Sequence, residues 1–97
     1  MRDEIKQALK TVYDPEIPVD IYELGLIYGV KESGQHVDIN MTLTSPGCPV
    51  AGMLLQSVEM AVKRVEGIES VYVNLVFHPT WSMDRMSEAA KLELGVL

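Results

Sequence analysis

Apolar residues along this 97-residue chain recur with two periods, one typical of helices and one typical of strands. The helical period covers residues 5–12, residues 50–65 and, near the end of the chain, residues 83–94. The first helix should end by Tyr13, because the residue after it precedes a proline. The second should stop at Gly67, since glycine commonly follows the last helical turn. The pattern therefore predicts three helices.

Residues 36–44 alternate between apolar and polar side chains, the period of a strand with one buried face. The apolar members are Val37, Ile39, Met41 and Leu43. The polar members, Thr42 among them, are expected to point outward. A preceding strand is predicted over residues 26–32, with Leu26, Tyr28 and Val30 on one face. Residues 71–77, rich in β-branched and aromatic side chains, predict a third strand.

The order helix, strand, strand, helix, strand, helix predicts an α+β two-layer sandwich. We expect a single domain over residues 1–97, with a mixed three-stranded sheet and the helices mainly on one face. The first two strands form a hairpin and should be antiparallel. The second and third strands are joined by a helix and should be parallel through a right-handed crossover.

This topology brings three separate segments to one edge of the sheet. Cys48 follows the second strand, His78 and Trp81 follow the third, and residues 14–16 lead into the first. We expect these segments to converge there. His36 begins the second strand and should lie at the opposite edge.

Cys48, the only cysteine, stands between a strand pattern and a helix pattern in the sequence Pro-Gly-Cys-Pro. Pro46 and Gly47 favour a turn, and Pro49 suits the first helical position because its missing N–H needs no partner there. Cys48 is therefore read as the N-cap of the helix. The helix dipole would favour the thiolate, lowering its pKa from about 8.5. The alternative is a thiol that is merely a small buried hydrophobe.

The composition sets limits on the partners. Apolar residues make up 47% of the chain and charged residues 23%, as in soluble globular proteins. The net charge of −6 argues against nucleic acid, whose phosphates require clustered Lys and Arg. The N-terminal residues lack the apolar run of a signal peptide, and no apolar stretch is long enough to span a membrane. We expect a cytoplasmic protein.

One thiol and two histidines are too few for a stable zinc or iron-sulfur site, which usually needs four protein ligands. Cys48 could instead carry a persulfide, hold one corner of a cluster transiently, or bind a metal together with a second chain. A cysteine hydrolase is the competing chemistry, with His78 as base and Asp14 or Glu16 orienting it. No further catalytic motif accompanies that arrangement.

Each candidate also has a structural explanation. His78 can be a solvated loop residue, and Trp81 can anchor the last helix by packing. Asp14, Pro15 and Glu16 can serve as turn and capping residues. Thr42 and Ser45 can be outward positions at a strand end, or they can hydrogen-bond a thiolate. These alternatives stay open on the residues alone.

Three motifs resemble one known family. They are residues 14–28 (DPEIPVDIYELGLIY), residues 41–49 (MTLTSPGCP), and Pro79-Thr80-Trp81 followed by residues 86–88 (MSE). In this order, and over nearly the whole chain, they resemble the small metal-sulfur cluster biosynthetic family. That family includes SufT-like and PaaD-like bacterial proteins and a domain of the eukaryotic cytosolic iron-sulfur assembly targeting complex.

The resemblance implies a non-enzymatic accessory factor for iron-sulfur cluster assembly or insertion into apo-proteins. The family's reactive cysteine falls on Cys48, and its Asp-Pro-Glu motif falls on residues 14–16. Thr42 and Ser45 are the residues that could hydrogen-bond this thiolate. Members often have Asn at position 20 and Pro-Pro-Trp at positions 79–81, often with an acidic residue near position 78. His78 is therefore a candidate ligand particular to this chain.

The cargo would be iron or an iron-sulfur cluster, held transiently. Scaffold or carrier proteins and apo-protein targets are the expected partners, contacted through the edge that includes Asp14, Pro15, Glu16 and Trp81. A homodimer is left open. The alternative function is a PaaD-like adaptor that matures a phenylacetyl-CoA oxygenase type enzyme without handling metal or cluster itself.

Overall fold

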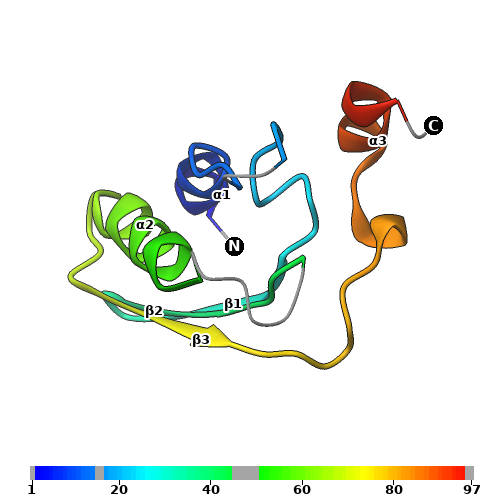
Figure 1. The fold of residues 1–97 in the computed structure, drawn as a ribbon. Helices are drawn as coiled ribbons and strands as arrows, with labels where there is room; N and C mark the ends of the chain where they lie inside the picture. The colour runs from blue at the N-terminus through cyan, green and yellow to red at the C-terminus, as the bar shows by residue number, and fades with distance from the viewer. Residues whose placement is uncertain (1, 15–16, 45–50, 96–97) are drawn as a thin grey trace.

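A three-stranded sheet with helices packed on one face forms the centre of the protein (Figure 1). The computed structural model describes residues 2–14, 17–44 and 51–95. The elements in chain order are α1 (Asp3–Leu9), β1 (Ile27–Ser33), β2 (His36–Met41), α2 (Ala51–Lys63), β3 (Ser70–Leu75), the 3-10 helix η1 (Met83–Arg85) and α3 (Glu88–Leu94). No helix in the described ranges has the length and apolar character needed to cross a membrane.

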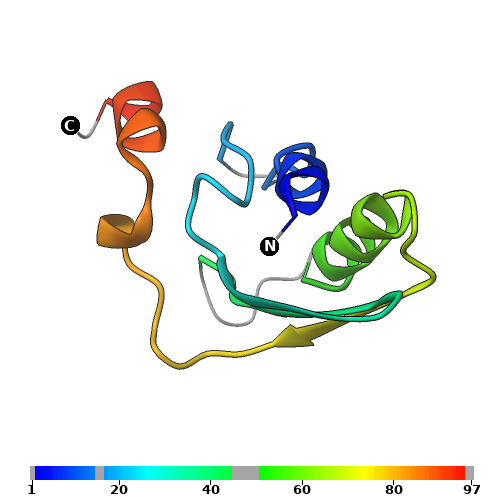
Figure 2. The ribbon, with the colours of Figure 1, turned by 180° about the vertical axis from the view of Figure 1, so that it is seen from behind.

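The sheet has the order β1-β2-β3, with β2 in the centre. β1 pairs antiparallel with β2, and β3 pairs parallel with β2. Helices α1 and α2 lie over one face, whereas α3 stands beyond the end of the sheet (Figures 1 and 2). The predicted α+β class and the mixed sheet are confirmed.

The core lies between the covered face of the sheet and the two helices. Alternation along β2 turns Val37, Ile39 and Met41 toward it, and all three are fully buried. The helices contribute further apolar side chains, which are Ile5 and Leu9 from α1 and Leu54, Val58 and Val62 from α2. Burial of these helical stripes in a core shared with the sheet holds the two layers together.

Helix α1 is shorter than its apolar pattern, because the chain leaves the helix after Leu9. The Thr11 hydroxyl donates a hydrogen bond to the Ala8 carbonyl oxygen at 2.6 Å. Tyr13 then forms an isolated antiparallel bridge with Asp20. Val12 remains buried although it lies outside the helix. The apolar spacing therefore located the buried residues but extended the helix too far.

A bulge in β1 changes which side chains face the core. Ile27 pairs with Met41, and the next pair along the strand joins Gly29 to Asn40. Tyr28 is the extra residue, so Ile27 and Val30, rather than Tyr28, share the face of the buried β2 residues. The predicted alternation through Leu26, Tyr28 and Val30 is wrong at this point.

The predicted final helix is divided into η1 and α3. Met86 between them is extended, with φ −68° and ψ 147°, and its side chain is buried. Ser87 caps α3 by accepting a hydrogen bond from the Ala90 N–H at 3.1 Å. Burial of Met86 and this new N-cap together explain why the helical pattern is interrupted.

Candidate functional site

The carboxyl ends of β2 and β3 and the start of β1 lie at the same edge of the sheet. This follows from the observed pairing, since β3 runs parallel and β1 antiparallel to β2. The segment after β3 packs against the residues just before β1. The edge is thus built from chain segments far apart in sequence (Figure 1).

Four of the residues predicted for this site lie outside the described residues. They are Pro15, Glu16, Ser45 and Cys48. Their roles, including the N-cap position and the activated thiolate, remain predictions. In the sequence, residues 45–50 separate the end of the described β2 segment from α2.

Trp81 joins the segment after β3 to the loop before β1. Its indole N–H donates a hydrogen bond to the Leu24 carbonyl oxygen at 2.7 Å, and the side chain is half-buried against the core. Further along, the Ser87 N–H donates to the Glu23 carbonyl oxygen at 2.9 Å. The anchoring role considered for Trp81 therefore matches its contacts.

Tyr28, the bulged residue of β1, also holds the C-terminal segment. Its hydroxyl donates to the Pro79 carbonyl oxygen at 2.8 Å, and the Arg85 guanidinium carbon lies 4.7 Å from its ring centroid. Gly25 lies beside this contact with φ +78°, and an added Cβ would come within 2.8 Å of the Arg85 carbonyl carbon. The backbones of Gly25 and Arg85 can approach only because residue 25 has no side chain.

The two histidines occupy opposite edges of the sheet, as predicted. His78 is exposed and follows β3. His36 begins β2 and contacts the Ser70 hydroxyl at 2.7 Å and the Asp38 carboxylate at 2.9 Å. Only His78 thus lies at the edge where the reactive cysteine was expected.

Asp14 has the turn role expected of it, whereas Thr42 does not have the outward position expected of it. The Asp14 carboxylate accepts a hydrogen bond from the Ile17 N–H at 3.2 Å, so this part of the acidic motif has the expected turn role. Thr42 is only 1% exposed, and its N–H donates to the Leu26 carbonyl oxygen at 2.9 Å. The predicted outward position of Thr42 is wrong, because its side chain is buried although its backbone still bonds to the residue before β1.

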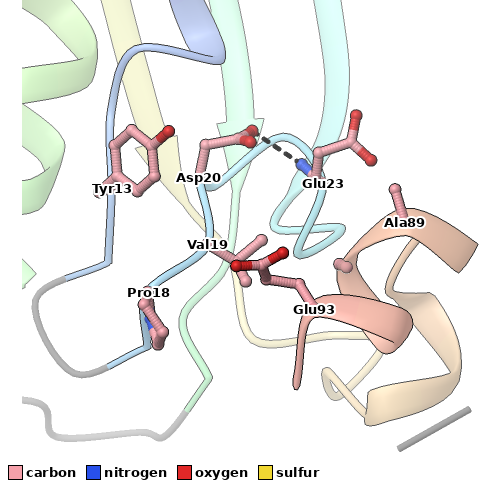
Figure 3. A pocket seen from close by; sticks show the side chains of 8 residues that line it. Tyr13, Pro18, Val19, Asp20, Glu23, Ala89 and Glu93 are labelled. Atoms are coloured by element: carbon pink, nitrogen blue, oxygen red, sulfur yellow. Dashed lines mark hydrogen bonds between the residues drawn. The ribbon is translucent and has the colours of Figure 1, made fainter. Parts of the chain in front are cut away.

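An acidic hollow of about 300 Å³ lies between the loop before β1 and α3 (Figure 3). Asp20, Glu23 and Glu93 line it together with Tyr13. The Asp20 carboxylate accepts a hydrogen bond from the Glu23 N–H at 3.0 Å. Sequence patterns alone did not single out Glu23, whose importance depends on contacts with two distant segments.

The pKa of Glu23 is held below its usual value. A hydrogen bond from the Ser87 hydroxyl is the largest cause, and the nearby Lys10 ammonium, 3.2 Å from the carboxylate, adds to it. Burial acts in the opposite direction but is outweighed. Glu23 is therefore an ionised link between α1, the loop before β1 and the start of α3.

No group of three or more His, Cys, Asp or Glu side chains within residues 2–14, 17–44 and 51–95 is arranged to hold a metal ion. This covers both histidines and the acidic hollow. The described part of the chain thus offers no preformed metal centre.

Comparison with known proteins identifies the family to which the chain belongs. Residues 2–75 match the iron-sulfur cluster assembly protein family, and the chain belongs to that family. It is 49% identical over 96 residues to an Fe-S protein maturation auxiliary factor of Porphyromonas gingivalis, covering 98% of this chain and 91% of the relative. It is also 41% identical over 86 residues to the Fe-S protein maturation auxiliary factor SufT of Staphylococcus aureus, covering 88% and 98%.

A solved structure supports the same assignment. The crystal structure of a domain of unknown function from Bacillus anthracis is 39% identical and matches with a TM-score of 0.90, covering 98% of this chain and 92% of that chain. The fold and family predicted from the three sequence motifs are confirmed. At the level of the family, so is an accessory role in iron-sulfur cluster assembly.

A more distant relative bears on the adaptor alternative. The chain is 35% identical over 92 residues to a putative 1,2-phenylacetyl-CoA epoxidase component of Escherichia coli, covering 94% of this chain and 55% of the relative. The PaaD-like part of the resemblance is therefore confirmed as well.

Replacement of Trp81 tests the anchor of the C-terminal segment. Trp81→Phe keeps an aromatic ring but removes the donor to the Leu24 carbonyl, so we expect the free energy of unfolding to fall by about 0.5–1.5 kcal/mol. Chemical denaturation measures this. Tyr13→Phe, at a residue that is 60% exposed, serves as the control. Equal losses in the two variants would contradict the anchoring role.

The lowered pKa of Glu23 predicts a pH-dependent contribution to stability. Because its folded pKa lies below the unfolded value, the contribution is fully present above pH 4.5 and is lost as the pH falls through the folded pKa. The difference in the free energy of unfolding between the wild type and Glu23→Gln should therefore become smaller as the pH falls.

Lys10→Gln provides the matched comparison for Glu23, measured by denaturation across the same pH range. It retains the Ser87 hydrogen bond, which is the larger cause of the shift. The gap between Lys10→Gln and Lys10→Gln/Glu23→Gln should thus still narrow as the pH falls. If neither difference in the free energy of unfolding changed with pH, the lowered pKa of Glu23 would be refuted.

Proposed function

We propose that this protein assists the maturation of iron-sulfur proteins by holding iron, sulfur or a cluster transiently at Cys48. The observation that carries the proposal is the family match over residues 2–75, which includes the sequence motif around this cysteine. The auxiliary factors of Porphyromonas gingivalis and Staphylococcus aureus named above support the same role.

The chemistry of the motif supports a sulfur-centred mechanism. Thiolates are good ligands for iron and are also the nucleophilic form in sulfur transfer. A helix start lowers the pKa of a nearby thiol, and α2 begins at Ala51, shortly after Cys48 in the sequence. We assign Thr42 to the support of this turn rather than to the cargo, because its side chain is buried. Ser45 is kept as a residue that hydrogen-bonds the thiolate.

A single thiol cannot enclose a cluster, so the cargo must share its ligands with another molecule. His78 is the exposed candidate for a second ligand from this chain. The remaining ligands would come from a scaffold, a carrier or an apo-protein target during transfer. Asp14, Pro15, Glu16 and Trp81 are proposed to belong to the surface that these partners contact.

We propose that the protein acts in the cytoplasm, where a thiol remains reduced. The net charge of −6 disfavours nucleic acid as a partner. Among the other relatives is an iron-sulfur cluster carrier protein of Deinococcus radiodurans, which supports a partner or cargo from the same machinery.

The second candidate function is an adaptor that brings a maturation complex to one client enzyme. The epoxidase component of Escherichia coli named above favours it. In that case the edge contacts a protein and the thiol has no cargo. Maturation of the client should then survive replacement of Cys48, whereas a carrier should lose activity.

Anaerobic reconstitution with ferrous iron, sulfide and a small thiol that can complete the ligand set tests the carrier proposal. We expect Cys48→Ala to lose the iron and acid-labile sulfide that the wild type retains after desalting. The loss should be close to complete, since the chain has no second thiol. Retention of equal amounts by both proteins would exclude Cys48 as the ligand and favour the adaptor.

The two histidines give a matched control for the reconstitution. His78→Ala should weaken retention if this side chain assists Cys48, whereas His36→Ala should not, because His36 lies at the opposite edge of the sheet. Circular dichroism of each variant shows whether the fold is intact. An equal effect of both substitutions would mean that His78 has no specific role.

The rate of thiol alkylation against pH tests the activated thiolate. We expect the midpoint for iodoacetamide labelling to lie below about 8.5, the value of an unperturbed cysteine. Wild-type protein unfolded in urea provides the reference. A folded midpoint at or above the unfolded one would remove the electrostatic basis of the mechanism, irrespective of iron binding.

A further inference from the structure

Strand β3 forms an outer edge of the sheet. Only β2 pairs with it, and no described element lies beyond it on the other side (Figures 1 and 2). The chain leaves β3 toward η1 and α3 at the far end of the molecule, so the C-terminal segment does not cover this edge.

The hydrogen-bond ladder shows which backbone groups of β3 face outward. At its two ends, the Ser70 N–H donates to the Gln35 carbonyl and the Val76 N–H donates to the Met41 carbonyl. In a parallel ladder, alternate residues bond to the same neighbour. Tyr72 and Asn74 therefore also bond to β2, whereas Val71, Val73 and Leu75 direct their N–H and C=O groups away from it.

No described residue outside the sheet hydrogen-bonds to these outward groups of Val71, Val73 and Leu75. Their side chains are half-buried and pack against the core. The edge thus combines free backbone donors and acceptors with a partly covered apolar row. Such an edge is a template for pairing with another strand.

The other outer strand of the sheet, β1, is protected against such pairing. β1 carries the bulge at Tyr28, the charged residues Lys31 and Glu32, and an ion pair at 3.1 Å between Arg2 and Glu32. Bulges and charges are the usual devices that prevent edge pairing. β3, with the sequence SVYVNL, has no bulge, proline or charged residue.

We propose that β3 pairs with β3 of a second copy of this chain, antiparallel and centred on Val73, to form a continuous sheet across the two copies. An uncharged strand that is self-complementary about a two-fold axis favours a second copy as the occupant. A chain with a net charge of −6 repels its own copies over most of its surface, and an uncharged strand is where that repulsion is weakest.

The register follows from the outward groups. With the two-fold axis at Val73, the two copies of this residue face each other, and Val71 of each chain faces Leu75 of the other. Each of these pairs exchanges hydrogen bonds through groups that are free of β2. Glu69, the nearest carboxylate before the strand, falls opposite Phe77, so no like charges meet.

The same register accounts for an exposed aromatic residue. Tyr72 is 59% exposed on the uncovered face of the sheet. Across the axis it faces Asn74, and the two tyrosines become diagonal neighbours, within reach of aromatic contact. Pairing therefore covers a side chain that the single chain leaves in solvent.

Amide hydrogen exchange by NMR at increasing protein concentration tests the proposal directly. The amides of Val71, Val73 and Leu75 should become protected about tenfold or more as dimer forms. Those of Tyr72 and Asn74 are bonded to β2 in both states and serve as internal controls. Rapid exchange of the three outward amides at every concentration up to the millimolar range would overturn the proposal.

A pair of charge variants tests the register by analytical ultracentrifugation. Y72K/N74K places like charges opposite each other twice, so the dissociation constant should rise at least about tenfold. Y72E/N74K places opposite charges there and should retain the dimer. Both variants lose the same hydrogen bond between Asn74 and Asn40. Residue 72 lies opposite Asp38 of β2 within each chain, so chemical denaturation of each variant separates its effect on the monomer from its effect on dimerisation.

Val73→Pro removes the central outward N–H without removing a bond to β2, and edge strands tolerate proline at such positions. It should abolish dimerisation while circular dichroism shows a folded chain. Equal dissociation constants for the two charge variants would overturn the register. Protection of Val73 that appears only on addition of an extended peptide, and not with concentration, would overturn the second copy as the occupant.

Discussion

The parallel pairing of β2 with β3 is the constraint on which the rest of the structure depends. It requires the chain to cross from one end of the sheet to the other between the two strands, and α2 makes that crossing. The crossing helix covers one face of the sheet, and its Val58 and Val62 are fully buried in the core. It also places the residues after β2 and β3 at one end of the molecule.

The parallel pairing also bears on the transfer role that we propose for this end. Carboxyl ends of neighbouring parallel strands lie close together whatever their separation in sequence. The contacts that hold the described part of this end include those of Trp81, Tyr28 and Ser87. Trp81 and Ser87 donate to backbone carbonyls of the loop before β1, whereas Tyr28 donates to the Pro79 carbonyl after β3. Chemistry placed there would be accessible to a partner without disturbing the core.

Much of the fold could be predicted because the strongest patterns coincide with the buried residues. The alternation of Val37, Ile39 and Met41 identified β2, and the order of the elements then determined the mixed sheet. The errors arose where tertiary contacts overrode local pattern. The bulge at Tyr28 allows its side chain to contact Pro79 and Arg85. The break at Met86 allows this side chain to be buried and Ser87 to cap α3.

The candidate site was less predictable from sequence than the fold. Spacing and topology brought His78 and Trp81 to the correct edge, but they gave no sign of Glu23, whose ionised carboxylate depends on Lys10 and Ser87. Such contacts join residues from three separate segments, and no local period records them. Thr42 was predicted to point outward from the alternation along β2, whereas its side chain is buried next to the buried Met41 and Leu43.

The close approach of Gly25 and Arg85 links two parts of the chain that the family match separates. The match ends at residue 75, so Gly25 lies inside it and Arg85 lies outside. A side chain at position 25 would collide with the Arg85 backbone in this chain. In relatives with a different C-terminal segment that steric restriction would be lifted, and residues that tolerate a left-handed backbone, such as asparagine, would become acceptable. Substitutions at position 25 and in the C-terminal segment should therefore covary among relatives.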